Sequence, residues 1–276
     1  MSATSLPSET RPDGAGHPLE SQPVSFGRVV KSEWVKFRSL RSSWAVLGGA
    51  VFGMVLIALL IAYNTRHIAP NIQAADLSAS SPLQGWYLGM YLIGALGVLF
   101  VTGEYGTGMI RSTLTAVPRR LPVLWAKLVV FVIVTLVAMI AASFVAFLAA
   151  EAFISHYRHG FSLGDPGVLR VVIGTGVFLT LPGMFGAGLG WIIRSTPGAL
   201  VTYFALLVAL PVVFATFLGG WGKTVAEYFP FYAGGSFVQT FRDPNTLAPW
   251  TGLLVVVLWV VVTMTIAAVV LRRRDA

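Results

Sequence analysis

The chain has 276 residues, of which 56% are hydrophobic and 11% are charged, with a net charge of +8 and a mean hydropathy of +0.78. A soluble domain of this size needs a more polar surface, so the composition indicates a polytopic membrane protein. The sequence contains no cysteine, which excludes disulfides, thiolate metal sites and cysteine nucleophiles.

The first 24 residues are polar, contain four prolines and have no apolar run. We expect residues 1–24 to form a disordered cytosolic tail without a cleavable signal peptide. Residues 25–276 are expected to form one all-α integral membrane domain. This domain would consist of an amphipathic surface helix, six transmembrane helices and a short cytosolic helix.

Residues 26–44 carry aromatic and basic side chains at helical spacing. This pattern predicts a helix in the membrane surface, with its basic face toward anionic headgroups and its aromatic face toward the acyl boundary. The simpler alternative is a basic flank of the first span. The candidate surface-helix residues are Arg28, Lys31, Trp34, Lys36, Phe37 and Arg38.

Six apolar stretches follow, each about long enough for a helix to cross the hydrocarbon core. None of them contains Asp, Glu, Lys, Arg or His. The predicted spans are 45–63, 86–102, 128–150, 171–193, 198–218 and 250–271.

The positions of the basic residues predict the orientation of the chain. If both ends lie on one side, that side collects 13 Lys and Arg in the flanks of the spans, and the other side collects 5. The excess of positive charge marks the cytosolic side, so both termini are expected in the cytosol. The basic charge is then mostly a matter of topology, and we expect no nucleic-acid partner.

Residues 103–122 form a polar connection between the second and third spans. Within it, Ile110, Leu114 and Val117 recur at i, i+4 and i+7, which predicts a short amphipathic helix. Pro118 ends this helix, because the residue before a proline is pushed out of the helical region. The helix is expected to present its apolar face to something outside the bilayer.

Motifs for chemistry within the chain are weak. The Gly-Lys-Thr sequence at 222–224 resembles the end of a phosphate-binding loop, but Phe217 stands where that loop needs a glycine. His156 and His159 lack the carboxylates that a metal site would add. The spans offer neither acid nor histidine for catalysis or ion coupling. We therefore expect no catalytic residue, cofactor or metal in the chain, and an external source of power.

Glu104 ends the second span, either as a solvated interfacial carboxylate without a role or as part of a motif. The order of residues around it resembles the membrane subunit of ABC-2 type transporters, the permeases of bacterial ABC exporters. Met109 departs from this pattern, since the family commonly has threonine there, although Thr107 is close enough to substitute. The matching positions are Glu104, Gly108, the helix around Met109 to Ala116, Pro118, Arg119, Arg120 and Lys127.

The resemblance implies that the cytosolic helix is a coupling helix that docks on a separate ATPase subunit, which binds ATP and Mg. Glu104 would then hold polar contacts that link this helix to the surface helix and the bundle. The candidate coupling residues are Glu104, Gly108, Met109, Ile110, Arg111, Leu114, Pro118, Arg119 and Arg120.

The same resemblance implies a multi-pass protein of the bacterial plasma membrane. Its partners would be the ATPase, membrane lipids and a second permease chain, either identical or a similar sister. The alternatives are a carrier or channel without an ATPase and a membrane immunity or assembly protein. The transported substrate stays open, and so does the choice between a re-entrant and a surface-lying outer connection at 219–249.

Overall fold

The structure is a computed structural model in which the described residues are 25–65, 81–117, 120–157, 160–239 and 246–273. This part of the chain is almost entirely helical and contains no strand. Six of its helical segments are long and apolar enough to cross a membrane. The protein is therefore an all-α integral membrane protein, as its composition indicates. The predicted tail lies outside the described residues.

The spans predicted from the sequence agree closely with the helices of the structure. Five of the six predicted spans lie entirely inside a helical segment. The exception is the predicted span 198–218, which extends one residue beyond the end of its segment. In chain order the elements are α1 (Phe26–Ser39), α2 (Arg41–Thr65), the 3-10 turn η1 (Ser81–Leu83), α3 (Trp86–Gly106), α4 (Met109–Ala116), α5 (Leu121–Ile154), α6 (Val168–Ile193), α7 (Thr196–Phe204), the π-helical turn η2 (Ala205–Ala209), α8 (Leu210–Phe217), α9 (Gly219–Ala226), α10 (Pro230–Phe237) and α11 (Pro249–Arg273).

The second and fourth spans, α3 and α6, form the centre of the bundle and pack through glycines. A Cβ atom at Gly97 of α3 would overlap the carbonyl oxygen of Gly183 of α6. A Cβ atom at Gly186 of α6 would likewise overlap the carbonyl oxygen of Gly94. Small residues allow two membrane helices to approach this closely, so these glycines fix the distance between the two central spans.

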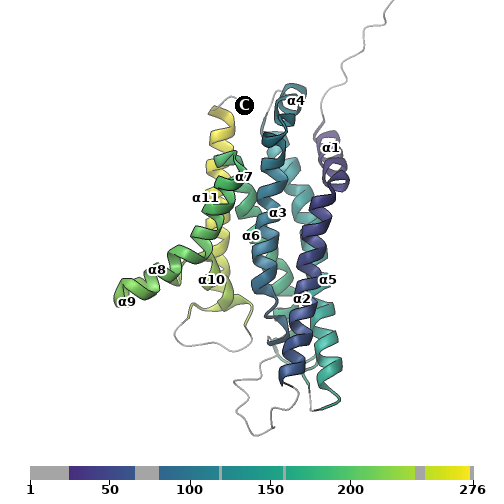
Figure 1. Cartoon of the computed structure of the whole chain (residues 1–276), viewed down its shortest axis with the longest axis vertical. Helices are drawn as coiled ribbons and strands as arrows, with labels where there is room; N and C mark the ends of the chain where they lie inside the picture. Colours follow the sequence, from purple (N-terminus) through teal and green to yellow (C-terminus); the bar gives the residue numbers. More distant parts are fainter. Residues whose placement is uncertain (1–24, 66–80, 118–119, 158–159, 240–245, 274–276) are drawn as a thin grey trace, which may run out of the picture.

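The fifth span is broken and leaves the bundle. It consists of α7, the π-helical turn η2 and α8, and Pro211 stands two residues after the end of the turn. Proline disturbs the helical hydrogen bonds of the preceding turn, which accounts for the irregularity at this point. In Figure 1, α8 and α9 run away from the other helices. In the most apolar 18-residue stretch of this span only 17% of the residues are buried, compared with 67% in the corresponding stretches of the second and fourth spans.

The predicted outer connection contains two short helices with different surroundings. α9 is largely exposed, and the Trp221 side chain is 60% exposed. α10 packs back onto the bundle, against α6 and α11. The Arg170 guanidinium at the start of α6 donates hydrogen bonds of 3.3 Å to the carbonyl oxygens of Phe237 and Gln239, which holds the end of α10 in place.

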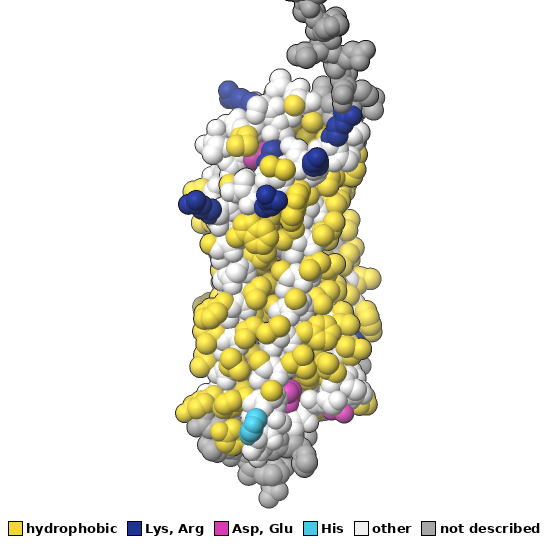
Figure 2. All heavy atoms as spheres, turned by 90° about the vertical axis from the view of Figure 1, so that its right-hand side faces the viewer, with side chains coloured by type: hydrophobic (Ala, Val, Ile, Leu, Met, Phe, Trp, Pro, Cys, Tyr) yellow, Lys and Arg dark blue, Asp and Glu magenta, His cyan; other side chains and the backbone are white. Residues whose placement is uncertain are grey.

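The two ends of the bundle differ in charge. α1, α4 and the last turns of α11 lie together at one end (Figure 1). Figure 2 shows Lys and Arg side chains gathered at that end, a broad apolar belt below it, and acidic and histidine side chains at the opposite end. This belt matches the membrane-spanning segments, so α1 and α4 lie beyond the apolar layer.

Candidate functional site

Four charged side chains meet where α1 and α4 join the bundle, and we call them the charge cluster. Glu33 and Lys36 come from α1, Glu104 from the last turn of α3 and Lys127 from the second turn of α5. Glu33, Glu104 and Lys127 are 1%, 7% and 2% exposed. Two carboxylates face two ammonium groups, so the formal charges of the cluster cancel.

Lys127 joins α5 to both α1 and α3. Its ammonium lies 2.6 Å from Oε2 of Glu33 and donates a 2.6 Å hydrogen bond to Oε1 of Glu104. The same ammonium lies 4.2 Å from the centroid of the Phe100 ring. An unpaired ammonium at this depth would be destabilised by several kcal/mol, and the two carboxylates and the aromatic face offset that penalty.

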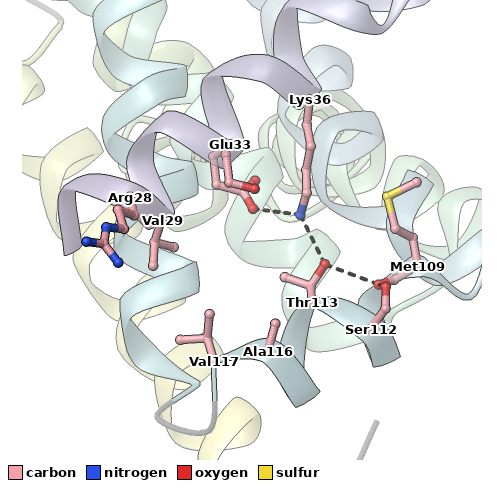
Figure 3. A pocket seen from close by; sticks show the side chains of 10 residues that line it. Arg28, Val29, Glu33, Lys36, Met109, Ser112, Thr113, Ala116 and Val117 are labelled. Carbon is pink, nitrogen blue, oxygen red and sulfur yellow. Dashed lines mark hydrogen bonds and ion pairs between the residues drawn. The ribbon is translucent and has the colours of Figure 1, made fainter. Parts of the chain in front are cut away.

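Lys36 adds α4 to the cluster. Its ammonium donates hydrogen bonds of 2.7 Å to Oε1 of Glu33, 3.0 Å to Oε1 of Glu104 and 3.0 Å to the hydroxyl oxygen of Thr113. Figure 3 shows this ammonium between Glu33 and Thr113. Burial lowers the pKa of Lys36, but its hydrogen bond and coulombic attraction to Glu33, and those to Glu104, outweigh burial, and the pKa lies above its ordinary value.

The spacing of residues on α1 explains why its charges point inward. Glu33, Lys36 and Phe37 lie at i, i+3 and i+4, which places them on one face of the helix. Phe37 is fully buried and meets the Phe100 ring edge-on, with 5.2 Å between centroids. The predicted assignment of Lys36 to a headgroup-facing side and Phe37 to an acyl-facing side is therefore wrong. Both residues face the rest of this chain.

The other predicted residues of the surface helix do lie on its outer side. Arg28, Lys31 and Arg38 are exposed, and the Trp34 side chain is 40% exposed. α1 is amphipathic, but its inner face is filled by an ion-paired and aromatic contact to α3 and α5. Contact with lipid headgroups stays a prediction for the outer basic side chains alone.

α4 has the predicted bounds, but its apolar face has a different partner from the one expected. Ile110 and Leu114 are 4% and 9% exposed and belong to the hydrophobic core of this chain. The expectation that they face a partner outside the bilayer is therefore wrong, because their side chains anchor α4 to its own bundle. The exposed side of α4 carries Met109, Arg111 and Ser112 instead.

The turn between α3 and α4 depends on Gly108. Its φ of +72° lies in the left-handed region, where a residue with a side chain is destabilised by roughly 1–2 kcal/mol. The hydroxyl of Thr107 donates a 2.9 Å hydrogen bond to the carbonyl oxygen of Gly103, at the end of α3. Thr107 therefore does not cap α4 as expected, and α4 begins without a side-chain cap.

The end of the predicted coupling segment is described only in part. Pro118 and Arg119 lie outside the described residues. Arg120 precedes α5, and its guanidinium donates a 3.3 Å hydrogen bond to the carbonyl oxygen of Leu271 near the end of α11. This predicted coupling residue thus contacts the last helix of its own chain.

A groove of about 400 Å³ runs between α1 and α4 beside the charge cluster. Figure 3 shows its two walls, with Arg28 and Val29 on the α1 side and Ser112 and Val117 on the α4 side. Its lining is mostly apolar, with Lys36 and Thr113 at the inner end. The groove is open to the end of the molecule and can receive a side chain or a short segment of another protein.

Sequence reasoning missed Glu33 and Thr113 and left Lys127 outside the candidate site. Glu33 is the one acidic residue in the basic stretch 26–44, and it stands three residues before Lys36. An acid among cations at helical spacing signals an internal ion pair. Thr113 gave no such signal, because a threonine in a short helix is compatible with many contacts.

The charge cluster is suited to holding helices together. In the described part of the chain, no three His, Asp or Glu side chains gather closely enough to hold a metal ion. The ion pairs of the charge cluster join α1, α3 and α5 at one point outside the apolar belt, and the Thr113 hydroxyl attaches α4 to them through a hydrogen bond from Lys36. The arrangement therefore connects α4 to α1, α3 and α5.

A family model described as ABC-2 family transporter protein matches residues 29–222, which is more than half of the chain. The matched range begins in the first turn of α1 and includes the whole charge cluster, α4 and the first five spans. No curated protein matches the chain.

Proposed function

Because the chain belongs to the ABC-2 family of transporter proteins, we propose that it is the permease subunit of an ATP-driven exporter whose power comes from a separate ATPase subunit. ATP and Mg would bind to that partner. Two permease chains would form the pathway, and α4 with the α1–α4 groove would receive the ATPase. The protein would lie in the bacterial plasma membrane with both termini in the cytosol.

The observation that carries this proposal is the connection of α4 to the charge cluster. α4 lies beyond the apolar belt, its inner face is anchored by Ile110 and Leu114, and its outer face is open. The Thr113 hydroxyl accepts a hydrogen bond from Lys36, which also donates to Glu104, and the hydroxyl itself donates a 3.4 Å hydrogen bond directly to Glu104. A force applied to the outer face would reach α1, the last turn of α3 and the second turn of α5 through these contacts.

The buried charges of the cluster favour joint movement of the connected helices over separation of the ion pairs. Ion pairs that are shielded from water interact more strongly than exposed pairs, because the local dielectric constant is low. Separation of Lys127 from Glu104 would leave Lys127 with Glu33 alone and Glu104 with Lys36 alone, so each buried charge would lose one of its two ionic partners. We infer that α4, α1 and the end of α3 move as one body when the ATPase closes on ATP.

The distribution of charge supports a cytosolic position for this end. Lys and Arg gather around α1 and α4 (Figure 2), as the positive-inside tendency requires of a cytosolic face. An ATPase that uses cytosolic ATP would meet α4 on that side. The low burial of the fifth span supports a second permease chain, because a large apolar surface there is left for lipid or another protein.

Co-purification tests the docking surface. Arg111 is exposed on α4, and Arg111→Glu should release the ATPase from the tagged chain in mild detergent. Arg41→Glu is the matched control, because Arg41 is also an exposed arginine at this end but belongs to α2. Retention of the ATPase by the Arg111 variant would argue against α4, and an intact chain without any ATPase would favour a carrier or channel.

A second experiment separates docking from transmission. Thr113→Val removes the hydroxyl that accepts a hydrogen bond from Lys36, whereas Thr115→Val removes an exposed hydroxyl that donates only within α4. We expect the Thr113 variant to keep its ATPase but hydrolyse ATP without transport. The Thr115 variant should transport normally. Equal transport by the two variants would remove Thr113 from the coupling path.

A further inference from the structure

A second groove lies on the side of the bundle, between α5 and α11, with α6 at its floor. Its volume is about 480 Å³. Trp125 and Leu128 line it from α5, Met184 from α6, and Val261, Thr265 and Arg272 from α11. All three helices are membrane-spanning segments, so this groove opens toward the bilayer.

The groove has the length of one leaflet. Its lining on α11 extends from Val260 to Arg272, which is about 18 Å at about 1.5 Å per residue. Half of a hydrocarbon core of about 30 Å is about 15 Å. The groove therefore runs from the middle of the bilayer to the surface at the end that carries α4 and the charge cluster.

The chemistry inside the groove suits a hydrocarbon chain. Thr265 carries a hydroxyl there, and that hydroxyl donates a 2.7 Å hydrogen bond to the carbonyl oxygen of Val261 within its own helix. The thioether side chains of Met184 and Met264 adapt to a flexible ligand. A polar solute would lose its hydrogen bonds to water in this groove without gaining others. An acyl chain makes no hydrogen bonds to water and would lose none.

The chemistry at the mouth of the groove is cationic. Arg272 lines the groove where α11 ends, and Arg273 follows it. Arg120 reaches the same place, since its guanidinium donates a hydrogen bond to the carbonyl oxygen of Leu271. Basic pockets between membrane helices at a membrane surface bind anionic lipid headgroups. Trp125, beside the mouth, is a residue type enriched at that depth.

We propose that this groove binds one anionic glycerophospholipid of the adjoining leaflet. One acyl chain lies between α5 and α11, and the phosphate lies against Arg272. A second copy of the chain is a poorer occupant, because a two-fold interface centred on the groove would bring two cationic mouths together. This lipid site is independent of the docking of an ATPase, so it can be tested on the isolated chain.

Native mass spectrometry of the detergent-solubilised chain tests the acyl part of the site. The probes are phosphatidylglycerol and phosphatidylcholine with the same acyl chains. Val261→Trp fills the groove, and Val262→Trp is its matched control, since both valines are 53% exposed and Val262 does not line the groove. We expect the Val261 variant to bind phosphatidylglycerol about tenfold more weakly and the Val262 variant to bind like the original chain.

The contact with the lipid headgroup is tested by a second pair of matched variants. Arg272→Gln should reduce the preference for phosphatidylglycerol over phosphatidylcholine by about fivefold, and Arg273→Gln should reduce it less, because Arg273 does not line the groove. Equal lipid binding by the two valine variants would overturn the site. A Val261 variant that breaks a dimer without losing lipid would assign the groove to a second copy.

Discussion

The second and fifth spans show two ways in which a membrane helix is used. α3 contains glycines and the buried Glu104, and 67% of the residues in the most apolar 18-residue stretch of this span are buried. The fifth span has no charged residue in its predicted range, yet only 17% of the residues in its most apolar 18-residue stretch are buried. Lipid is as apolar as leucine, so hydrophobicity alone does not bring helices together in a membrane. Close packing and polar contacts place α3 at the centre.

The largest expected effect lies at the polar end of α3. Lys127→Met leaves two buried carboxylates to share Lys36, and we expect a loss of about 3–5 kcal/mol in the free energy of unfolding. Thermal or denaturant unfolding in detergent measures it. Lys223→Met removes an exposed ammonium on α9 and should change stability by less than about 0.5 kcal/mol. Similar values for the two variants would show that the cluster adds little to stability.

The next effect concerns the glycine contact of α3. Gly97→Ala forces α3 and α6 apart, because the new methyl group would overlap the carbonyl oxygen of Gly183, and a loss of about 1–3 kcal/mol should follow. Gly103→Ala on the same helix meets nothing within 4 Å and should stabilise the chain by about 0.5–1 kcal/mol. Unfolding of both variants in detergent tests this difference in sign.

A matched pair of valines compares the two spans directly. Val98 of α3 is fully buried, whereas Val201 of the fifth span is 69% exposed. In the solubilised single chain, Val98→Ala should lower the free energy of unfolding by about 1 kcal/mol and Val201→Ala by less than about 0.5 kcal/mol. A comparable loss at Val201 would mean that another molecule covers the fifth span under these conditions.

The smallest effect is the pH dependence that Lys36 adds. Its folded-state pKa lies above the ordinary value of 10.5, so the folded chain holds this proton more tightly than the unfolded chain. The resulting stability is complete below 10.5 and is lost as the pH rises through the folded pKa. Above about pH 10.5, stability should fall more steeply in the original chain than in a Lys36→Gln variant. Parallel slopes would contradict the ion pairs of Lys36.

Much of the fold was accessible from the sequence because the bilayer restricts what a spanning segment can be. The length of apolar runs predicted all six spans, and the spacing of Ile110 and Leu114 together with Pro118 predicted the bounds of α4. Periodicity reports that a helix has an apolar face. It does not report whether that face meets lipid, a partner or the chain itself, and for α4 the answer was the chain itself.

The candidate site was only partly accessible for a related reason. Glu104 drew attention because it ends an apolar run, but its partners Lys36 and Lys127 stand 68 and 23 residues away in sequence. Which of several cations a buried acid meets depends on how helices pack. Glu33 was hidden in a basic stretch whose charge suggested contact with headgroups. The local spacing of Glu33 and Lys36 signals their own ion pair, but the contacts of these residues with Glu104 and Lys127 leave no local pattern in the sequence.

The corner between α1 and α2 determines how motion would pass along the chain. The two helices are separated by the single extended residue Leu40, and the corner is braced by the Trp44 indole, which donates a 3.1 Å hydrogen bond to the carbonyl oxygen of Arg38 and meets the Phe37 ring edge-on. Such a corner connects the two helices rigidly and does not act as a flexible hinge. A sideways displacement of α1 would therefore tilt the first span about Leu40.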